Sequence, residues 1–135
     1  MRVPRRLLLA AGAMALAACA ARGPRHELVL TPEADPEVQE ALARPASTPP
    51  VKTHDVKPER PGGLLTGGAR LSVVLDAVIT REGKVKVYGV RRSDDAEFAW
   101  ECVRAVSRWR YQPPTGTDGA PVPLRTTAVC SVTTQ

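Results

Sequence analysis

The sequence has few aromatic residues and few histidines. One Phe, two Tyr and two Trp are spread over 135 residues, and all five aromatic residues lie between Tyr88 and Tyr111. The two histidines, His26 and His54, stand far apart and have no cysteine at metal-ligand spacing beside them. The sequence therefore predicts a small core in the second half of the chain and no metal site.

The sequence also lacks the motifs of the common catalytic sites. It has no Gly-x-Ser-x-Gly motif, no histidine after position 63, and no pair of carboxylates at a recognisable catalytic spacing. Asp94 and Asp95 are better explained by helix-cap chemistry than by acid–base chemistry. We expect a protein that is not an enzyme and that needs no cofactor.

Strong charge of one sign is missing as well. The net charge of +5 falls to +2 without Arg2, Arg5 and Arg6, which belong to an apparent export signal. After position 67 there are ten Lys or Arg and seven Asp or Glu with the signs interspersed. This is an ordinary solvated surface, which argues against a nucleic-acid partner.

No apolar run is long enough to be a typical membrane span, which takes about 20 residues. Residues 1–6 are basic and residues 7–18 are apolar or small, which is typical of a secretory signal. The signal ends in Leu16-Ala17-Ala18-Cys19, which resembles the bacterial lipobox, where cleavage precedes a cysteine that then carries a diacylglyceryl group. The sequence thus predicts a signal peptide over 1–18 and lipidation of Cys19.

This resemblance implies a cell-envelope lipoprotein that faces the periplasm. Ala20 after the cysteine carries no inner-membrane retention cue, which favours the outer membrane over the inner one. The alternative is an uncleaved signal-anchor helix over 7–21 in which Cys19 is an incidental thiol.

Residues 19–63 have the composition of a flexible, disordered spacer. Eight of the thirteen prolines lie between Pro24 and Pro61. One island, residues 35–44, predicts a short helix with Asp35 as N-cap and with Val38 and Leu42 on one face. Because a ten-residue helix is marginal alone, it is expected to be transient unless it docks. As a coil this spacer averages roughly 35–40 Å, and proline stiffening extends its reach beyond about 100 Å.

Residues 64–135 predict a small α+β domain with the order β-β-α-β. Residues 71–80 and 122–132 alternate between apolar and polar, and Gly83 lies in the hairpin turn that leads to a second strand over 85–91. A shift of the apolar phase indicates a bulge near Gly89. We expect an antiparallel sheet with one helix packed across it.

The helix of this domain is predicted from its cap and its apolar stripe. Asp94 and Glu97 form a capping-box pattern, and Pro113-Pro114 prevents its continuation. The stripe consists of Phe98, Cys102, Ala105 and Trp109. Trp100 points away from this stripe, and it is either a surface contact for a partner or a half-covered surface side chain.

Three cysteines are an odd number for an exported protein, but lipidation of Cys19 leaves the pair Cys102 and Cys130. Both fall on inward faces of elements that pack together. A disulfide between them closes a loop of about 29 residues and stabilises the fold by roughly 3–4 kcal/mol in the chain-entropy model. The alternative is two free buried thiols.

Four segments of the second half resemble the C-terminal domain of the TonB energy-transducer family, over about residues 68–132. They are Arg81-Glu82-Gly83-Lys84-Val85, Val90-Arg91-Arg92-Ser93, Ala105-Val106-Ser107-Arg108-Trp109-Arg110-Tyr111-Gln112-Pro113 and Gly119-Ala120-Pro121-Val122. The Trp-Arg-Tyr-x-Pro run is the most specific of these. The family also carries a proline-rich periplasmic spacer, which residues 20–63 match in kind.

The resemblance implies a domain that pairs a strand edge with an extended peptide, usually a segment of a TonB-dependent outer-membrane receptor. It implies a partner-binding strand formed by Leu124, Arg125, Thr126, Thr127, Ala128, Val129 and Ser131. The function expected from this is a lipid-anchored, TonB-like protein that binds an envelope partner and is linked to transmembrane transport.

The chain departs from the family at its front, because TonB transducers meet the ExbB–ExbD motor through an uncleaved membrane helix. Three other outcomes stay open: a genuine energy transducer with an uncleaved anchor, a structural envelope lipoprotein, and a dimer formed by edge-strand pairing.

Overall fold

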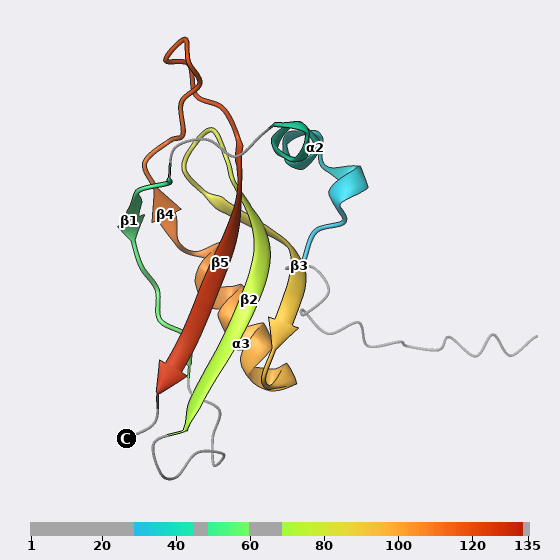
Figure 1. Cartoon of the computed structure of the whole chain (residues 1–135), viewed down its shortest axis with the longest axis vertical. Coiled ribbons are helices and arrows are strands. Elements are labelled where there is room, and N and C mark those ends of the chain that lie inside the picture. Colours follow the sequence, from blue (N-terminus) through green and yellow to red (C-terminus); the bar gives the residue numbers. More distant parts are fainter. Residues whose placement is uncertain (1–28, 45–48, 60–68, 134–135) are drawn as a thin grey trace, which may run out of the picture.

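The computed structural model describes residues 29–44, 49–59 and 69–133 (Figure 1). The predicted signal peptide and the predicted lipidation site Cys19 lie outside these residues. The segment that resembles the TonB domain is described almost in full, together with much of the expected spacer.

Three strands with alternating burial form the central sheet. They are β2 (Arg70–Ile79), β3 (Val85–Ser93) and β5 (Leu124–Thr133), in the order β3-β2-β5 with both pairs antiparallel. The expected inward-facing residues meet across the strands, for example Val73 with Cys130 and Leu75 with Ala128. The predicted alternation is therefore confirmed, because one face of each strand is buried against a helix.

The turn between β2 and β3 needs a glycine. Gly83 has a φ of +80°, and a Cβ built there would lie 2.1 Å from the carbonyl oxygen of Tyr111. The amide of Tyr111 in turn donates to the Gly83 carbonyl at 2.8 Å. Positive φ and close backbone approach are both properties that favour glycine, so the prediction for this turn is confirmed.

The bulge expected near Gly89 is present. Asp76 is opposite Gly89 while the adjacent Ala77 is opposite Val87, so Tyr88 is the extra residue on β3. Because adjacent residues of a strand point to opposite faces, Val87 packs in the main core, whereas Tyr88 packs in a second cluster with Val78 of β2.

Helix α3 (Ala96–Ser107) covers one face of the sheet (Figure 1). Phe98, Cys102 and Ala105 are buried as its periodicity predicts. The predicted Asp94 capping box is wrong by one residue. The N-cap is Asp95, whose carboxylate accepts from the Phe98 amide at 2.7 Å, whereas the Asp94 carboxylate accepts from the Ser72 amide at 2.9 Å. A contact 22 residues away therefore decided between two adjacent aspartates.

Parts of the expected spacer are folded against this domain. Helix α2 (Pro36–Ala43) follows the 3-10 turn η1 (Pro32–Ala34), and its predicted N-cap Asp35 accepts from the amides of Glu37 and Val38. The short strand β1 (Lys52–His54) pairs with β4 (Arg110–Tyr111), which follows α3. The described spacer segments thus differ from the flexible coil that their composition predicts.

Helix α2 lies on the sheet face opposite α3. Val38 and Ala41 are fully buried in the second cluster, against Val78 and beside Leu42 and Tyr88. A short helix is stable when it has a surface on which to dock, and the sheet face that carries Val78 and Tyr88 provides that surface for α2. The architecture is a small α+β fold, as predicted.

Candidate functional site

A three-stranded sheet has two outer strands whose edges a partner strand can use. In this protein the β3 edge is already occupied at Val87. Val29 forms a parallel bridge to it, and the Leu30 amide donates to the Val87 carbonyl at 2.9 Å. Strand β5 pairs with β2 along all ten of its residues, and within the described segments no strand pairs with its other edge.

The direction of the β5 backbone groups follows from the hydrogen bonds of β2. Ser72 exchanges bonds with Asp94, and the Thr80 amide donates to Lys84, so even-numbered residues of β2 turn toward β3. Odd-numbered residues of β2 then turn toward β5, where they are paired with even-numbered residues. Five residues of β5 therefore have N–H and C=O groups that point away from β2: Arg125, Thr127, Val129, Ser131 and, at the end of the strand, Thr133.

This result divides the predicted partner-binding strand into two sets. Arg125, Thr127, Val129 and Ser131 have exposed side chains and outward backbone groups. Leu124, Thr126 and Ala128 turn their backbone groups to β2, and Leu124 and Ala128 are buried. The structure thus brings the seven residues together on one outer strand, but only the first set presents its main chain to the open edge.

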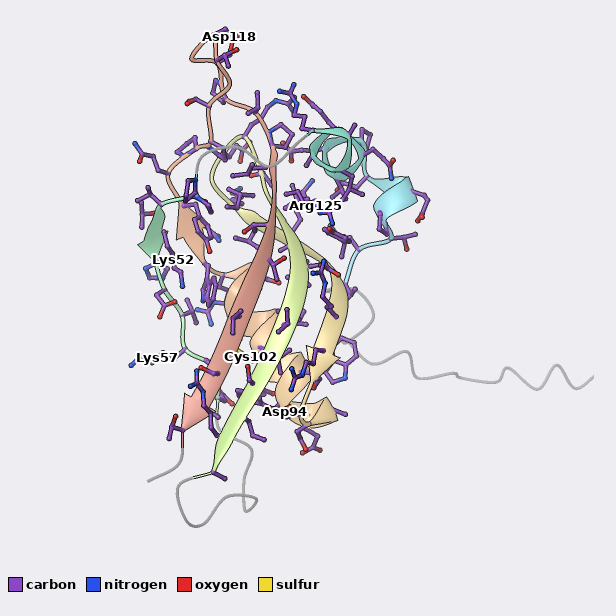
Figure 2. All side chains as sticks on the ribbon, in the orientation of Figure 1. Lys52, Lys57, Asp94, Cys102, Asp118 and Arg125 are labelled. Carbon is purple, nitrogen blue, oxygen red and sulfur yellow. A yellow bond between two sulfur atoms is a disulfide. The ribbon has the colours of Figure 1, made fainter. Side chains whose placement is uncertain are left out.

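A groove of about 350 Å³ borders this edge at the end of β5. One wall is residues 130–133 of β5, the other wall is residues 55–58 of the spacer, and Trp109 also lines it. Lys52 and Lys57 mark this extended spacer segment beside β5 (Figure 2).

Trp109 attaches the spacer wall to the domain. Its ring is buried, its Nε1 donates to the Val56 carbonyl at 2.8 Å, and the Lys52 ammonium lies 3.3 Å from the ring centroid. Lys52 also pairs with Asp55 at 2.8 Å. The sequence identified Trp109 as a core residue of the helix stripe but gave no local signal for residues 55–58, whose position depends on contacts 53 residues away.

The neighbouring Tyr111 is held in the same junction. Burial raises the pKa of its phenol, and the nearby Asp55 carboxylate adds to this effect. Lys52 is opposite Tyr111 in the β1–β4 pair, and the Gln112 amide donates to the Val51 carbonyl at 2.9 Å. The spacer wall is therefore fixed at several points along its length.

Cys102 and Cys130 form a disulfide with a Cα–Cα distance of 5.8 Å. It joins α3 to the core face of β5, and the pairing is the one predicted from the two inward faces. The bond holds the outer strand on its helix while leaving the outward backbone groups of its neighbours accessible.

Trp100 lies half-buried on α3 and packs against the main core. Trp100 is not among the residues that line the groove at the β5 edge. Its role as a partner contact remains a prediction.

A depression of about 420 Å³ lies elsewhere, around the β2–β3 turn. Three of its cations are ion-paired: Arg81 with Glu37 and Glu40, Lys86 with Asp35 and Glu37, and Lys84 with Glu82. The fourth, Arg110, donates to the carbonyls of Ser107 and Trp109.

Among the described residues, no three His, Cys, Asp or Glu side chains gather as a metal site would require. In the same part of the chain, no helix has the length and apolar character to span a membrane.

Residues 68–129 match the family model described as Gram-negative bacterial TonB protein C-terminal. These residues form a TonB C-terminal domain. The match includes β2, β3, α3, β4 and more than half of β5, whereas α2 and β1 lie before it. No curated protein matches the chain.

The TonB C-terminal family is a non-enzymatic energy-transducing or binding domain of the Gram-negative cell envelope, and its members interact with outer-membrane receptors or other proteins. The match of residues 68–129 accordingly indicates a TonB-like protein tied to envelope transport.

Proposed function

We propose that this protein is a lipid-anchored, periplasm-facing TonB-like protein that binds an extended segment of an envelope partner along the outer edge of β5. The observation that carries this proposal is the unpaired outward row of Arg125, Thr127, Val129 and Ser131 next to a groove. The most direct partner is a periplasmic segment of a TonB-dependent outer-membrane receptor.

The chemistry of binding is strand addition. A partner strand that lies about 4.8 Å from β5 exchanges N–H···O=C bonds with the outward residues, and these bonds supply affinity whatever the partner's side chains are. Selectivity then comes from side chains at the groove, where Trp109 and Val132 offer apolar surface and Asp55 and Lys57 offer charge. The β3 edge is occupied at Val87 by Val29 and Leu30, which favours β5 as the edge used.

The lipid anchor is supported by the Leu16-Ala17-Ala18-Cys19 run that follows a basic and then an apolar segment. Lipidation of Cys19 with export accords with the Cys102–Cys130 disulfide, because disulfides persist in oxidising compartments such as the periplasm. An uncleaved anchor with energy transduction, or a structural lipoprotein, is the alternative that the tests below separate.

The test is a titration of the ¹⁵N-labelled full chain with a synthetic receptor segment, compared with a scrambled segment of the same composition. We expect amide shifts at Thr127, Val129 and Ser131 and at the Trp109 indole. Unchanged spectra at millimolar concentration of the receptor segment would contradict strand binding.

A matched pair of variants checks that the main chain carries the binding. Val129→Pro removes one outward N–H, which β5 does not donate to β2, whereas Val129→Thr keeps that N–H and the branched Cβ. Since one net hydrogen bond is worth about 0.5–1.5 kcal/mol, the proline variant should bind the segment roughly 2- to 12-fold more weakly. Equal affinity of the two variants would point to side-chain recognition instead.

A further inference from the structure

The docked spacer shortens the tether that joins the domain to its anchor. Counted from Cys19 to Ala69, where the main domain begins, 50 residues would allow a fully extended reach of about 160–180 Å. Val29, however, already contacts the domain through its bridge to Val87. Ten residues from Cys19 to Val29 span at most about 35 Å.

Two kinds of contact keep the first part of the spacer in place. The apolar contact is the burial of Val38 and Ala41, both 0% exposed, against Val78 and Tyr88. Apolar burial of this kind is worth on the order of 1.5–3 kcal/mol for one valine-sized side chain. This cluster is separate from the main core under α3, so α2 can be released without opening that core.

The second kind of contact is an ionic network around the same helix. Lys86 of β3 lies 2.8 Å from the Asp35 carboxylate and 3.3 Å from that of Glu37. Arg81 in the β2–β3 turn pairs with Glu37 and Glu40. The acidic side of α2 therefore faces the basic hairpin, which fixes both the position and the direction of the helix.

The second spacer segment is held independently through Trp109 and Gln112, which bind Val56 and Val51. Release of the first segment alone would therefore lengthen the tether to the 32 residues between Cys19 and Val51, or about 105–115 Å at full extension. Docking of α2 changes the maximal reach about threefold.

We propose that α2 acts as a strap that holds the TonB-like domain against the membrane carrying Cys19, so that its partner strand belongs to a protein of that same membrane surface. Val29 lies at the β3 edge, and β5 lies two strand spacings further on, about 10 Å (Figure 1). The binding edge is thus within about 45 Å of the membrane and lies on the opposite side of the sheet from Val29. The membrane part of this inference rests on the lipid anchor of the proposed function.

The strap is tested with two variants that add the same side chain at adjacent positions of α2. Val38→Glu places a carboxylate in the fully buried cluster. Gln39→Glu adds it on the exposed side of the helix, where it removes only the exposed hydrogen bond from Gln39 Nε2 to the Pro32 carbonyl. Both leave the main core under α3 unchanged, and protection of the β2 amides against hydrogen exchange verifies that the domain is still folded.

Hydrogen exchange of the full chain measures docking. The Leu30 amide, which donates to Val87, should be protected in the wild type and in Gln39→Glu and should lose at least tenfold of this protection in Val38→Glu. Equal protection in both variants, or no protection in the wild type, would overturn the strap.

Reach is measured with the acylated protein on vesicles, by energy transfer from Trp100 and Trp109 to an acceptor on the lipid headgroups. We expect Val38→Glu to lower the transfer about twofold or more, and Gln39→Glu to leave it unchanged. Unaltered transfer in Val38→Glu would contradict a strap that sets distance.

The two proposals fail in different ways. A protein without acyl mass that does not bind vesicles would remove the anchor, and with it the membrane inference, whatever the exchange data show. Loss of receptor-segment binding, with docking and transfer intact, would contradict strand binding at β5 and leave the strap in place.

Discussion

At the scale of single residues, the two glycines with positive φ have the same backbone conformation but different steric surroundings. Gly83 has a φ of +80° and Gly119 a φ of +79°, but a Cβ at Gly83 would lie 2.1 Å from a backbone oxygen, whereas a Cβ at Gly119 meets nothing within 4 Å. Gly119→Ala should therefore cost only the conformational penalty, about 1–2 kcal/mol.

Gly83→Ala should cost clearly more than Gly119→Ala, by about 1 kcal/mol or more, because the Tyr111 carbonyl has to move and its strand β4 carries the pairing with β1. Urea unfolding of both variants with the same m-value gives the comparison. Equal losses would mean that the hairpin accommodates the methyl group by a backbone shift.

Predictions for single residues succeed where a local pattern decides them and fail where a distant contact does. The alternation of β2 and β5, the glycine of the hairpin and the pairing of Cys102 with Cys130 all follow from local patterns, and the structure confirms them. The choice between Asp94 and Asp95 as N-cap could not be made locally, because it depends on the Ser72 amide of a distant strand.

At the scale of elements, the disulfide joins the outer strand β5 to α3. The double variant Cys102→Ala/Cys130→Ala should lower the free energy of unfolding by about 3–4 kcal/mol, because the unfolded chain regains the entropy of a loop of about 29 residues. Thermal unfolding of the wild type with and without reductant serves as the control, since reduction opens the loop while keeping both sulfur atoms in the core.

A fall in stability on substitution without a fall on reduction would assign the effect to lost packing of Cys102 and Cys130, both almost fully buried. The domain has a small core, so we expect the cross-link to dominate.

Docking of α2 should depend on pH. The hydrogen bond from Lys86 lowers the pKa of Asp35 below its ordinary 3.8, and the one from Arg81 lowers the pKa of Glu40 below its ordinary 4.5. A carboxylate whose pKa is lower when docked stabilises docking fully above its undocked pKa and loses this contribution as the pH falls through the docked pKa. Docking should therefore be constant above about pH 5.5 and weaken below about pH 4.5.

The chemical shift of Tyr88, which lies in the α2 cluster, is the measurement for this titration. Glu40→Gln keeps the shape of the side chain but removes its charge. It should therefore reduce the change in the Tyr88 chemical shift between about pH 5.5 and the acid limit by the contribution of Glu40. A transition between pH 6 and 8 would contradict these pairs as its origin, because neither carboxyl titrates there.

The sequence did not predict that α2 and β1 pack against the domain, and the physical reason is the same for both. A ten-residue helix and a three-residue strand in a proline-rich stretch have too little local stability to be predicted as folded. What stabilises them is distant: Val78 and Tyr88 for α2, and Trp109 for the segment after β1. The partner-binding strand was implied by the resemblance to the TonB C-terminal domain, but the second wall of the groove beside β5 could not be predicted from the sequence.

At the scale of the whole molecule, the position of the chain in the envelope depends on its mature N-terminus. The charge order, the apolar run and the lipobox predict cleavage before Cys19 and acylation of its thiol, so the intact mass of the membrane-extracted protein should correspond to residues 19–135 plus acyl groups. Cys19→Ser is the matched variant, because it removes the acylated thiol and leaves the folded residues from Val29 onward unchanged.

This variant should leave the membrane fraction while retaining the disulfide and the binding of the receptor segment. Such a result would make direct coupling to an inner-membrane motor untenable, because an acyl-anchored chain has no intramembrane helix on which a motor can act. An intact mass that corresponds to a chain beginning at Met1 would contradict the lipid anchor. Residues 7–21 would then be the anchor, and energy transduction would explain the protein better. In either case the short stretch before Val29, ten residues from Cys19 or eight from residue 21, would set how far the binding edge of β5 lies from its membrane, and not the full length of the spacer.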